Sequence, residues 1–461
     1  MIRKDLKIIL IVVILFVSLL IINNLKYDKI NGNSIFDDIK SLFNPAVEKE
    51  IVNEDIKEES LNNKNHFDFS EVSIEELKEQ VEDIKEETFT GTVAVLHSDD
   101  FENPENSKEY YFLQSNGKNY RLISQNELNL VSRQQVEIKG ESFQDKIYIE
   151  STEKIRVVED KSPRPDPNSL RYAVILISFL DNPIEYYTHE EVSNKIFGDV
   201  NNFYLENSYN MFSLTGEVYG YYRLDQNSGC YTWWNEAIIA ADDDIYYPDY
   251  DGIIVLFKTD RETCYFDGIA SIGSFMFSTS DGVINLRATS IVAPNPNYQE
   301  NPNSYVADHE LGHNLGAFHA NLLDCGDNSI PTVNACNHIE YGDQYSIMGV
   351  SNGGIIPGRR PYHFNAREKE IFNWFGNFDR QTITEPGLYS ISPIELNDDN
   401  VKYYKIPRRD SYNSFYYIEY RQPIGFDSNL GNGEVTQGAL IHLVMNSDYY
   451  FTDRNYLIDT N

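Results

Sequence analysis

The segment HELGHNLGAFH, from His309 to His319, decides how the middle of this 461-residue chain is expected to fold. His309 and His313 are four residues apart, so on a helix their side chains lie on one face. Gly316 permits a positive φ, which lets the helix end and the chain turn sharply. The turn brings His319 back toward the other two histidines. The spacing therefore predicts a helix, a glycine turn and three imidazoles that converge on one point.

Three converging imidazoles are typical of a catalytic Zn²⁺ site, because three protein ligands leave a fourth position open for water. His309, His313 and His319 are therefore the predicted zinc ligands. Glu310 adjoins the first of them and is the predicted general base and then general acid. It would take a proton from metal-activated water and pass it to the leaving amine. This chemistry hydrolyses an amide bond without a covalent intermediate.

The pattern HExxHxxGxxH resembles the zinc signature of the metzincin metallopeptidases, and YGDQYSIMG is similar to their Met-turn. Its pairing of YGD with SIMG resembles the gametolysin family most, as do HFNAREKEIFNW and YYIEYRQPIGFDS further along the chain. The resemblance extends from about Thr88 to the last residue. It implies that Met348 packs as a hydrophobic floor beneath the histidines. It also implies a substrate that lies extended along an edge strand, for which we expect the segment from Val283 to Val292.

Two features depart from this resemblance. No cysteine precedes Cys230, so a propeptide thiolate cannot cap the zinc. An inhibitory propeptide must then block the site sterically, or through a carboxylate or a water molecule. Some metzincins also carry a tyrosine ligand two residues after the methionine, where this chain has Val350. Tyr345 lies three residues before Met348, and we do not assign it to the metal.

The regions around the motif predict an α+β fold in several parts. Residues 88–159 alternate apolar and polar residues, which predicts a small all-β domain of about five strands, a candidate propeptide. Residues 168–385 interleave strands and helices, and we expect a metzincin-like catalytic domain with a mixed twisted sheet and an active-site helix. A helical stretch there presents one apolar face: Val192, Ile196, Val200 and Phe203.

Residues 386–461 are β-rich, with strands expected at LYSISPIE, KYYKIP, SFYYIEYRQP and ALIHLVM. The sequence then ends at NYLIDTN without an evident closing element, so this β-rich region is a candidate for an incomplete domain.

The first 87 residues predict export. Residues 1–30 place Arg3, Lys4 and Lys7 before an apolar run from Ile8 to Ile22, interrupted only by Ser18. This pattern favours an uncleaved membrane anchor over a cleaved signal peptide, and either one places the remaining chain outside the cell. Residues 31–87 read as an acidic linker. The formal net charge of -34 argues against a nucleic-acid partner.

Four cysteines in an exported chain fit two disulfides. Cys325 and Cys336 are close in sequence and are expected to pair across one loop, which leaves Cys230 for Cys264. The run Asp242, Asp243 and Asp244 is a candidate Ca²⁺ site, although the absence of EF-hand spacing favours a solvated turn. The histidines outside the motif are expected to be surface or hydrogen-bonded core residues: His189, His338, His363 and His442.

Together these features predict a zinc-dependent endopeptidase that hydrolyses extracellular or cell-surface proteins. One alternative is a non-catalytic surface adhesion or binding protein on a metzincin scaffold, against which the presence of Glu310 argues. A metal-dependent hydrolase of non-peptide substrates is a further alternative. Activity against a broad peptide library separates these functions.

Overall fold

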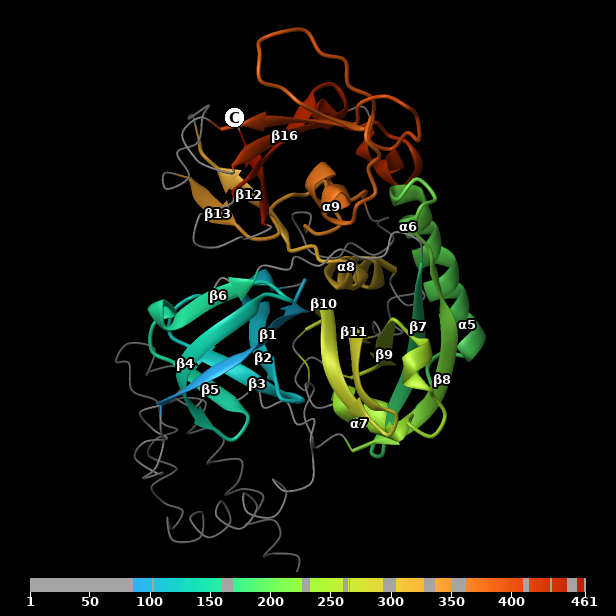
Figure 1. The fold of residues 1–461 in the computed structure, drawn as a ribbon. Coiled ribbons are helices and arrows are strands. Elements are labelled where there is room, and N and C mark those ends of the chain that lie inside the picture. Colours follow the sequence, from blue (N-terminus) through green and yellow to red (C-terminus); the bar gives the residue numbers. More distant parts are fainter. Residues whose placement is uncertain are drawn as a thin grey trace, which may run out of the picture. The chain divides into compact units, whose positions relative to one another are not determined.

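The computed structural model describes residues 86–101, 103–128, 130–159, 169–225, 233–259, 264, 266–292, 304–326, 336–349, 362–408, 414–431, 433–445 and 454–459. The predicted anchor and most of the acidic linker lie outside these residues. In the described part of the chain, two sheets of 11 and 7 strands form the framework, with few helices (Figure 1). No helix among the described residues has both the length and the apolar character needed to cross a membrane.

The 11-stranded sheet has the order β6-β4-β5-β3-β2-β1-β10-β11-β9-β7-β8. Six of its strands come from the predicted N-terminal β-domain: β1 (Glu86–Asp99), β2 (Lys108–Ser115), β3 (Lys118–Ser124), β4 (Gln135–Phe143), β5 (Lys146–Ile149) and β6 (Ile155–Glu159). The other five follow: β7 (Leu170–Phe179), β8 (Leu214–Leu224), β9 (Gly252–Phe257), β10 (Gly268–Thr279) and β11 (Gly282–Val292). We call residues 86–159 the β-unit; it has six strands where the sequence suggested about five.

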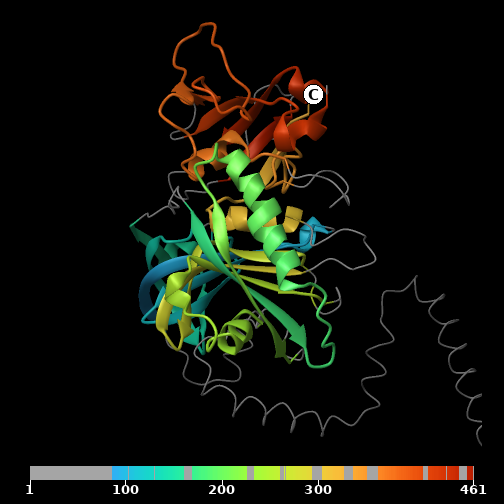
Figure 2. The same cartoon turned by 90° about the vertical axis from the view of Figure 1, so that its right-hand side faces the viewer.

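Strands β7, β8, β9 and β11 run parallel, and β10 is antiparallel to β11, so this part of the sheet is mixed. One face carries the expected helical stretch, which consists of α5 (His189–Asn194), a π-helical turn (Lys195–Val200) and α6 (Asn201–Asn207) (Figure 2). All four predicted apolar residues of this stretch are buried, in one core with α8 (Ser304–Asn314). The opposite face carries α7 (Trp233–Ala240).

The β-unit shares its cores with the rest of the sheet. Because side chains alternate along a strand, β1 sends Ala94 and Leu96 into the core around α7, and Val93 and Val95 into the core of the β-unit. Two aromatic side chains, one from the β-unit and one from outside it, are each buried in the core of the other part. Phe101, just after β1, is buried in the core around α8, while Phe318 of the HELGHNLGAFH segment is buried in the core of the β-unit.

The 7-stranded sheet has the order β13-β12-β18-β17-β16-β15-β14. Its strands are β12 (Ala320–Asp324), β13 (Asn337–Ile339), β14 (Arg380–Thr382), β15 (Tyr403–Pro407), β16 (Phe415–Tyr420), β17 (Ala439–Val444) and β18 (Asn455–Asp459), with α9 (Ala366–Ile371) packed on them. The strand expected at LYSISPIE is wrong. That segment makes isolated backbone hydrogen bonds, from Ser392 N to Val401 O and from Ile394 N to Tyr420 O, and its Leu388 is fully exposed.

The last described strand, β18, pairs with β17 on one side and with β12 on the other. Residues Asn455–Asp459 of this last segment therefore form an interior strand, which the sequence pattern did not predict. Since β12 begins directly after His319, this sheet starts at the histidine motif itself.

Candidate metal centre

The helix α8 ends with the histidine motif, as the sequence predicted. His309, His313 and Glu310 lie on it and are fully buried, and His319 is 3% exposed. Gly316 has a φ of 104°, a conformation that side chains other than glycine rarely adopt, and it turns the chain after the helix.

The methionine of the expected Met-turn packs against this helix. Met348 is fully buried, and a Cβ added at Gly312 would lie 2.6 Å from the Met348 sulfur. Phe364 reaches the same glycine, because its ring would lie 3.0 Å from that Cβ. Gly312, between the two helical histidines, therefore lets Met348 and Phe364 approach the helix backbone.

Each of the three motif histidines is oriented by a hydrogen bond at Nδ1. His309 donates to the carbonyl of Ile347 at 2.8 Å, and His313 donates to the carbonyl of Ala317 at 2.8 Å. His319 donates to the carboxylate of Glu340 at 3.0 Å. Because Nδ1 carries the proton in each ring, Nε2 presents a lone pair, as in metal-binding histidines.

All three Nε2 atoms face a carboxylate that comes from the β-unit. Oδ1 of Asp99, the last residue of β1, lies 2.7 Å from Nε2 of His319 and 3.5 Å from Nε2 of His309. Its Oδ2 lies 3.5 Å from Nε2 of His313. Burial opposes ionisation of Asp99, but His97, His319 and His309 hold its pKa well below the usual value.

This arrangement fits a metal ion. A lone pair and a carboxylate oxygen both accept hydrogen bonds, so an approach of 2.7 Å needs a proton or a cation between His319 and Asp99. Nε2 of His309, Nε2 of His313 and Oδ2 of Asp99 are buried without a hydrogen-bond partner among the described residues. Buried acceptors of this kind are costly unless a cation binds them. Imidazole nitrogens with one carboxylate oxygen are ligands that Zn²⁺ accepts.

Glu310 lies between the helix and the strand β10. A Cβ added at Gly268, the first residue of β10, would lie 2.1 Å from Oε1 of Glu310. Gly268 is also the residue that faces Asp99 in the pairing of β1 with β10. Burial, followed by the charge of Asp99, raises the pKa of Glu310 well above the usual value. The predicted base is therefore adjacent to the metal-binding atoms and packs against the first residue of β10.

The expectation that Val283 to Val292 form an edge strand is wrong. Residues Val283 to Val292 lie in β11, which pairs with β10 on one side and with β9 on the other. The strand beside Glu310 is β10, and its outer side is covered by β1 through the pairs from Val95–Ile272 to Asp99–Gly268. The hairpin of β10 and β11 folds back so that the earlier strand becomes the outer one, which local sequence does not reveal.

Four residues of this centre were not predicted: His97, Asp99, Glu340 and Tyr341. Tyr341 donates its hydroxyl hydrogen to Oδ1 of Asp99 at 2.6 Å, and its ring lies 3.7 Å from that of His319. The available signal was strand alternation in AVLHSDD, which places His97 and Asp99 on one face. The one sequence feature that suggested a propeptide carboxylate at the metal was the absence of cysteine before Cys230.

The remaining predicted residues lie elsewhere. His338 is exposed on β13. His363 is buried and contacts Glu206, and His442 is buried and contacts Asp343. His189 donates a hydrogen bond to the carbonyl of Gly220.

The candidate calcium residues form a turn. Asp242 accepts a hydrogen bond from the amide of Ser280, and Asp244 accepts one from the hydroxyl of Tyr222. Within the described ranges, the cluster that could hold a metal consists of His97, Asp99, His313 and His319. The predicted ligand His309 is not a member of this cluster, although its Nε2 lies 3.5 Å from Oδ1 of Asp99.

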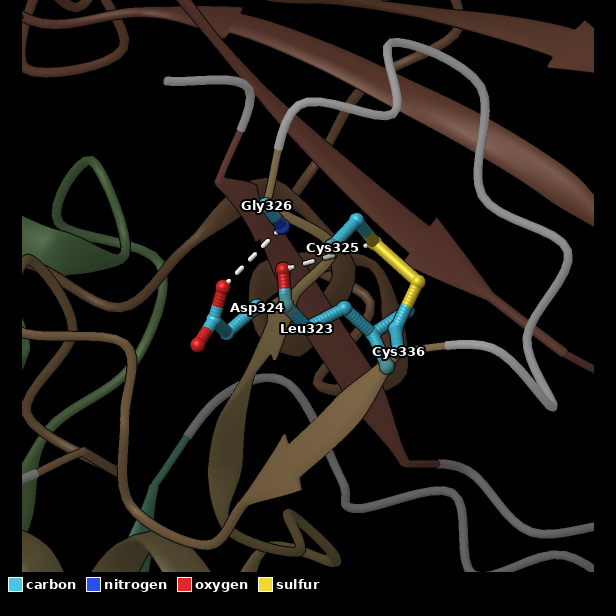
Figure 3. The surroundings of a disulfide bond; sticks show 5 residues. All are labelled: Leu323, Asp324, Cys325, Gly326 and Cys336. Atoms are coloured by element: carbon cyan, nitrogen blue, oxygen red, sulfur yellow. Dashed lines mark hydrogen bonds between the residues drawn. A yellow bond between two sulfur atoms is a disulfide. The ribbon is translucent and has the colours of Figure 1, made fainter.

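The disulfide expected between Cys325 and Cys336 is present (Figure 3). It joins the residue after β12 to the residue before β13, with 4.3 Å between the Cα atoms, and so closes the connection between these two strands. Cys264 is also disulfide-bonded, while Cys230 lies outside the described residues. A disulfide is compatible with an extracellular location.

Comparisons with known proteins do not establish a family for this chain. No protein-family model matches the sequence, and no curated protein matches it. Among solved structures, metalloproteinase-II from Bacteroides fragilis is a distant neighbour, at 12% sequence identity and a TM-score of 0.28. The match covers 65% of this chain and 95% of that one. A TM-score of this size is too low to establish a shared fold.

Proposed function

We propose that this chain is the latent form of a zinc-dependent endopeptidase that acts on extracellular or cell-surface proteins. The observation that carries the proposal is the approach of three Nε2 atoms to the carboxylate of Asp99, with Glu310 beside them against the start of β10. The sequence resemblance to metzincins, and to the gametolysin family in particular, supports the same proposal. In this proposal His309, His313 and His319 hold Zn²⁺, and Met348 supports the helix that carries two of them.

When bound, Zn²⁺ would activate a water molecule and polarise the scissile carbonyl. Glu310, beside the histidines, would act as general base and then general acid, taking a proton from water and giving it to the leaving amine. Removal of Asp99 takes away one of the two groups that raise the pKa of Glu310, and so favours its basic form.

The substrate groove is proposed from the position of β1. Residues Val95 to Asp99 lie along β10 as an added antiparallel strand. An extended peptide that replaced them would gain the same backbone hydrogen bonds and would pass directly over Glu310. This favours a peptide substrate over a small non-peptide one. In this proposal the β-unit is a propeptide that fills the substrate groove and would also bind the metal ion.

The test compares the parent chain with Glu310→Ala, each cut between residues 159 and 169 and assayed against a peptide library. The parent should cleave peptides, lose this activity on chelation and regain it with zinc. Glu310→Ala should retain zinc and cleave nothing. The proposal is wrong if Glu310→Ala cleaves as fast as the parent, or if activity persists after the metal is removed. A cut chain that binds zinc but cleaves no peptide would support the adhesion alternative.

A further inference from the structure

His97 lies at the candidate metal centre but has no role in the proposed function. It precedes Asp99 by two residues on β1, so both side chains point to the same face of the strand. His97 is 2% exposed. Its ring stacks on that of His313, with 5.2 Å between centroids and 15° between planes, and meets the ring of His319 edge-on at 4.0 Å.

The ligand atoms of His97 belong to the cluster around the metal position. One atom each from His97, Asp99, His313 and His319 lies within 4.8 Å of all the others. Nδ1 of His97 is 3.4 Å from Oδ1 of Asp99. Nδ1 is buried and makes no hydrogen bond with any described residue. The Nδ1 edge of the ring therefore has no hydrogen-bond partner and is turned toward the metal-binding atoms.

The other ring nitrogen of His97 faces two carboxylates. Nε2 lies 3.8 Å from Oε1 of Glu109 and 3.9 Å from Oε1 of Glu340. Acceptors on this side favour the tautomer with hydrogen on Nε2, which leaves the lone pair on Nδ1. A ligand histidine whose distal N–H faces a carboxylate is the usual outer arrangement of a metal site. Glu340 also accepts the Nδ1 hydrogen of His319 at 3.0 Å, so one carboxylate lies beside both rings.

We propose that His97 is a metal ligand of the latent centre, so that β1 supplies two ligands, Nδ1 of His97 and a carboxylate oxygen of Asp99. The inference rests on the metal centre of the proposed function and extends it to an imidazole from the β-unit. In this proposal the latent ion has four histidine ligands and the ion of the released enzyme has three. His97, His313 and His319 lie in one cluster with Asp99. His309 lies outside that cluster and approaches it through Asp99, whose Oδ1 is 3.5 Å from its Nε2. Zinc tolerates an expanded coordination shell. Removal of the β-unit withdraws two ligands together and opens positions for water and substrate.

The experiment counts imidazoles. Zinc X-ray absorption is recorded on the uncut full-length chain carrying Glu310→Ala, which prevents self-cleavage, and again after the β-unit has been cut away and removed. The uncut chain should show four imidazoles and the released chain three. In the uncut chain, His97→Phe keeps an aromatic ring against His313 but should lower the count to three. Loss of zinc to a chelator should become roughly tenfold faster or more. The matched control is His338→Phe, at an exposed position, which should change neither value.

Three imidazoles in the uncut parent would overturn the inference and leave the proposed zinc endopeptidase intact. So would a His97→Phe chain with the parent's spectrum and zinc release rate, because His97 would then only fill space. A chain that holds no zinc in either form would overturn both proposals. If His97→Phe fails to fold, the count in the uncut parent still decides, since it needs no substitution at this residue.

Discussion

The carboxylate of Asp99 lies 2.7 Å from Nε2 of His319, although 220 residues separate them along the chain. Backbone contacts fix this position as well. The amide of Asp267 donates to the carbonyl of Asp99 at 2.7 Å, and the amide of Phe101 donates to the carboxylate of Asp267 at 3.0 Å. Asp99 is therefore held at the histidines by its side chain and by its backbone.

Asp99→Ala should activate the uncut chain in part. Losing a hydrogen bond to a charged group costs about 1.5–3 kcal/mol, which corresponds to a roughly 10- to 100-fold larger population of chains with an open site. We expect a rise of this order in hydrolysis of a fluorogenic peptide, with the chain shown by mass spectrometry to be uncut.

Glu105→Ala, at an exposed carboxylate of the same β-unit, should leave the uncut chain as inactive as the parent. An uncut Asp99→Ala chain without activity, whose cut form is active, would show that β1 blocks the groove by its bulk alone.

Local sequence was sufficient for the histidine motif but not for its surroundings. The helical spacing of His309 and His313 and the positive φ of Gly316 are local properties, and both predictions are confirmed. Asp99 and His97 could not be placed, because only the pairing of β1 with β10 brings them to α8. Strand order within a sheet is likewise non-local, so the edge strand was assigned to β11 instead of β10.

Phe101 and Phe318, each buried in the other part's core, should determine how slowly the β-unit dissociates after the chain is cut. Phe318 is 5% exposed in the core of the β-unit, and truncating a buried phenylalanine costs about 3–5 kcal/mol. Phe318→Ala should therefore speed dissociation of the β-unit by at least roughly 100-fold. The measurement cuts a protease site engineered between residues 159 and 169 and follows release by gel filtration.

Phe378→Ala is the matched control, because the Phe378 side chain is 78% exposed. Equal release rates for the Phe318→Ala and Phe378→Ala chains would mean that the shared core does not hold the β-unit in place.

Arg421 supports the 7-stranded sheet near Phe364, which packs against α8. It is 1% exposed and pairs at 2.7 Å with both Glu419 and Asp427, while it also donates to the carbonyl of Phe364. Arg421→Met leaves two buried carboxylates without their cation, which typically costs 3–5 kcal/mol. Urea unfolding should show a loss of this size.

Arg156→Met serves as the comparison, because the Arg156 side chain is 70% exposed and its pair with Glu137 lies at the surface. Such pairs contribute about 0–1 kcal/mol. If both variants lost the same small amount of stability, the buried cluster would not stabilise this sheet.

Glu370 should make stability depend on acidity. Burial opposes its ionisation, but Lys405, Arg367 and the hydroxyls of Tyr417 and Tyr403 lower its pKa to about 2. The folded-state pKa lies below that of an unfolded glutamate, near 4.3, so the carboxylate stabilises the fold above about pH 4.3. This stabilisation disappears as the pH falls toward 2. Glu370→Gln should cost about 3 kcal/mol at pH 7, from a shift of roughly two units.

The free energy of unfolding of Glu370→Gln and of the parent should therefore converge between about pH 4 and pH 2, because protonation then removes the same charge from the parent. Glu385→Gln, at an exposed position, should follow the parent over the whole range. A gap that stayed constant down to pH 2.5 would mean that packing of the Glu370 side chain, and not its charge, stabilises α9 against β15 and β16.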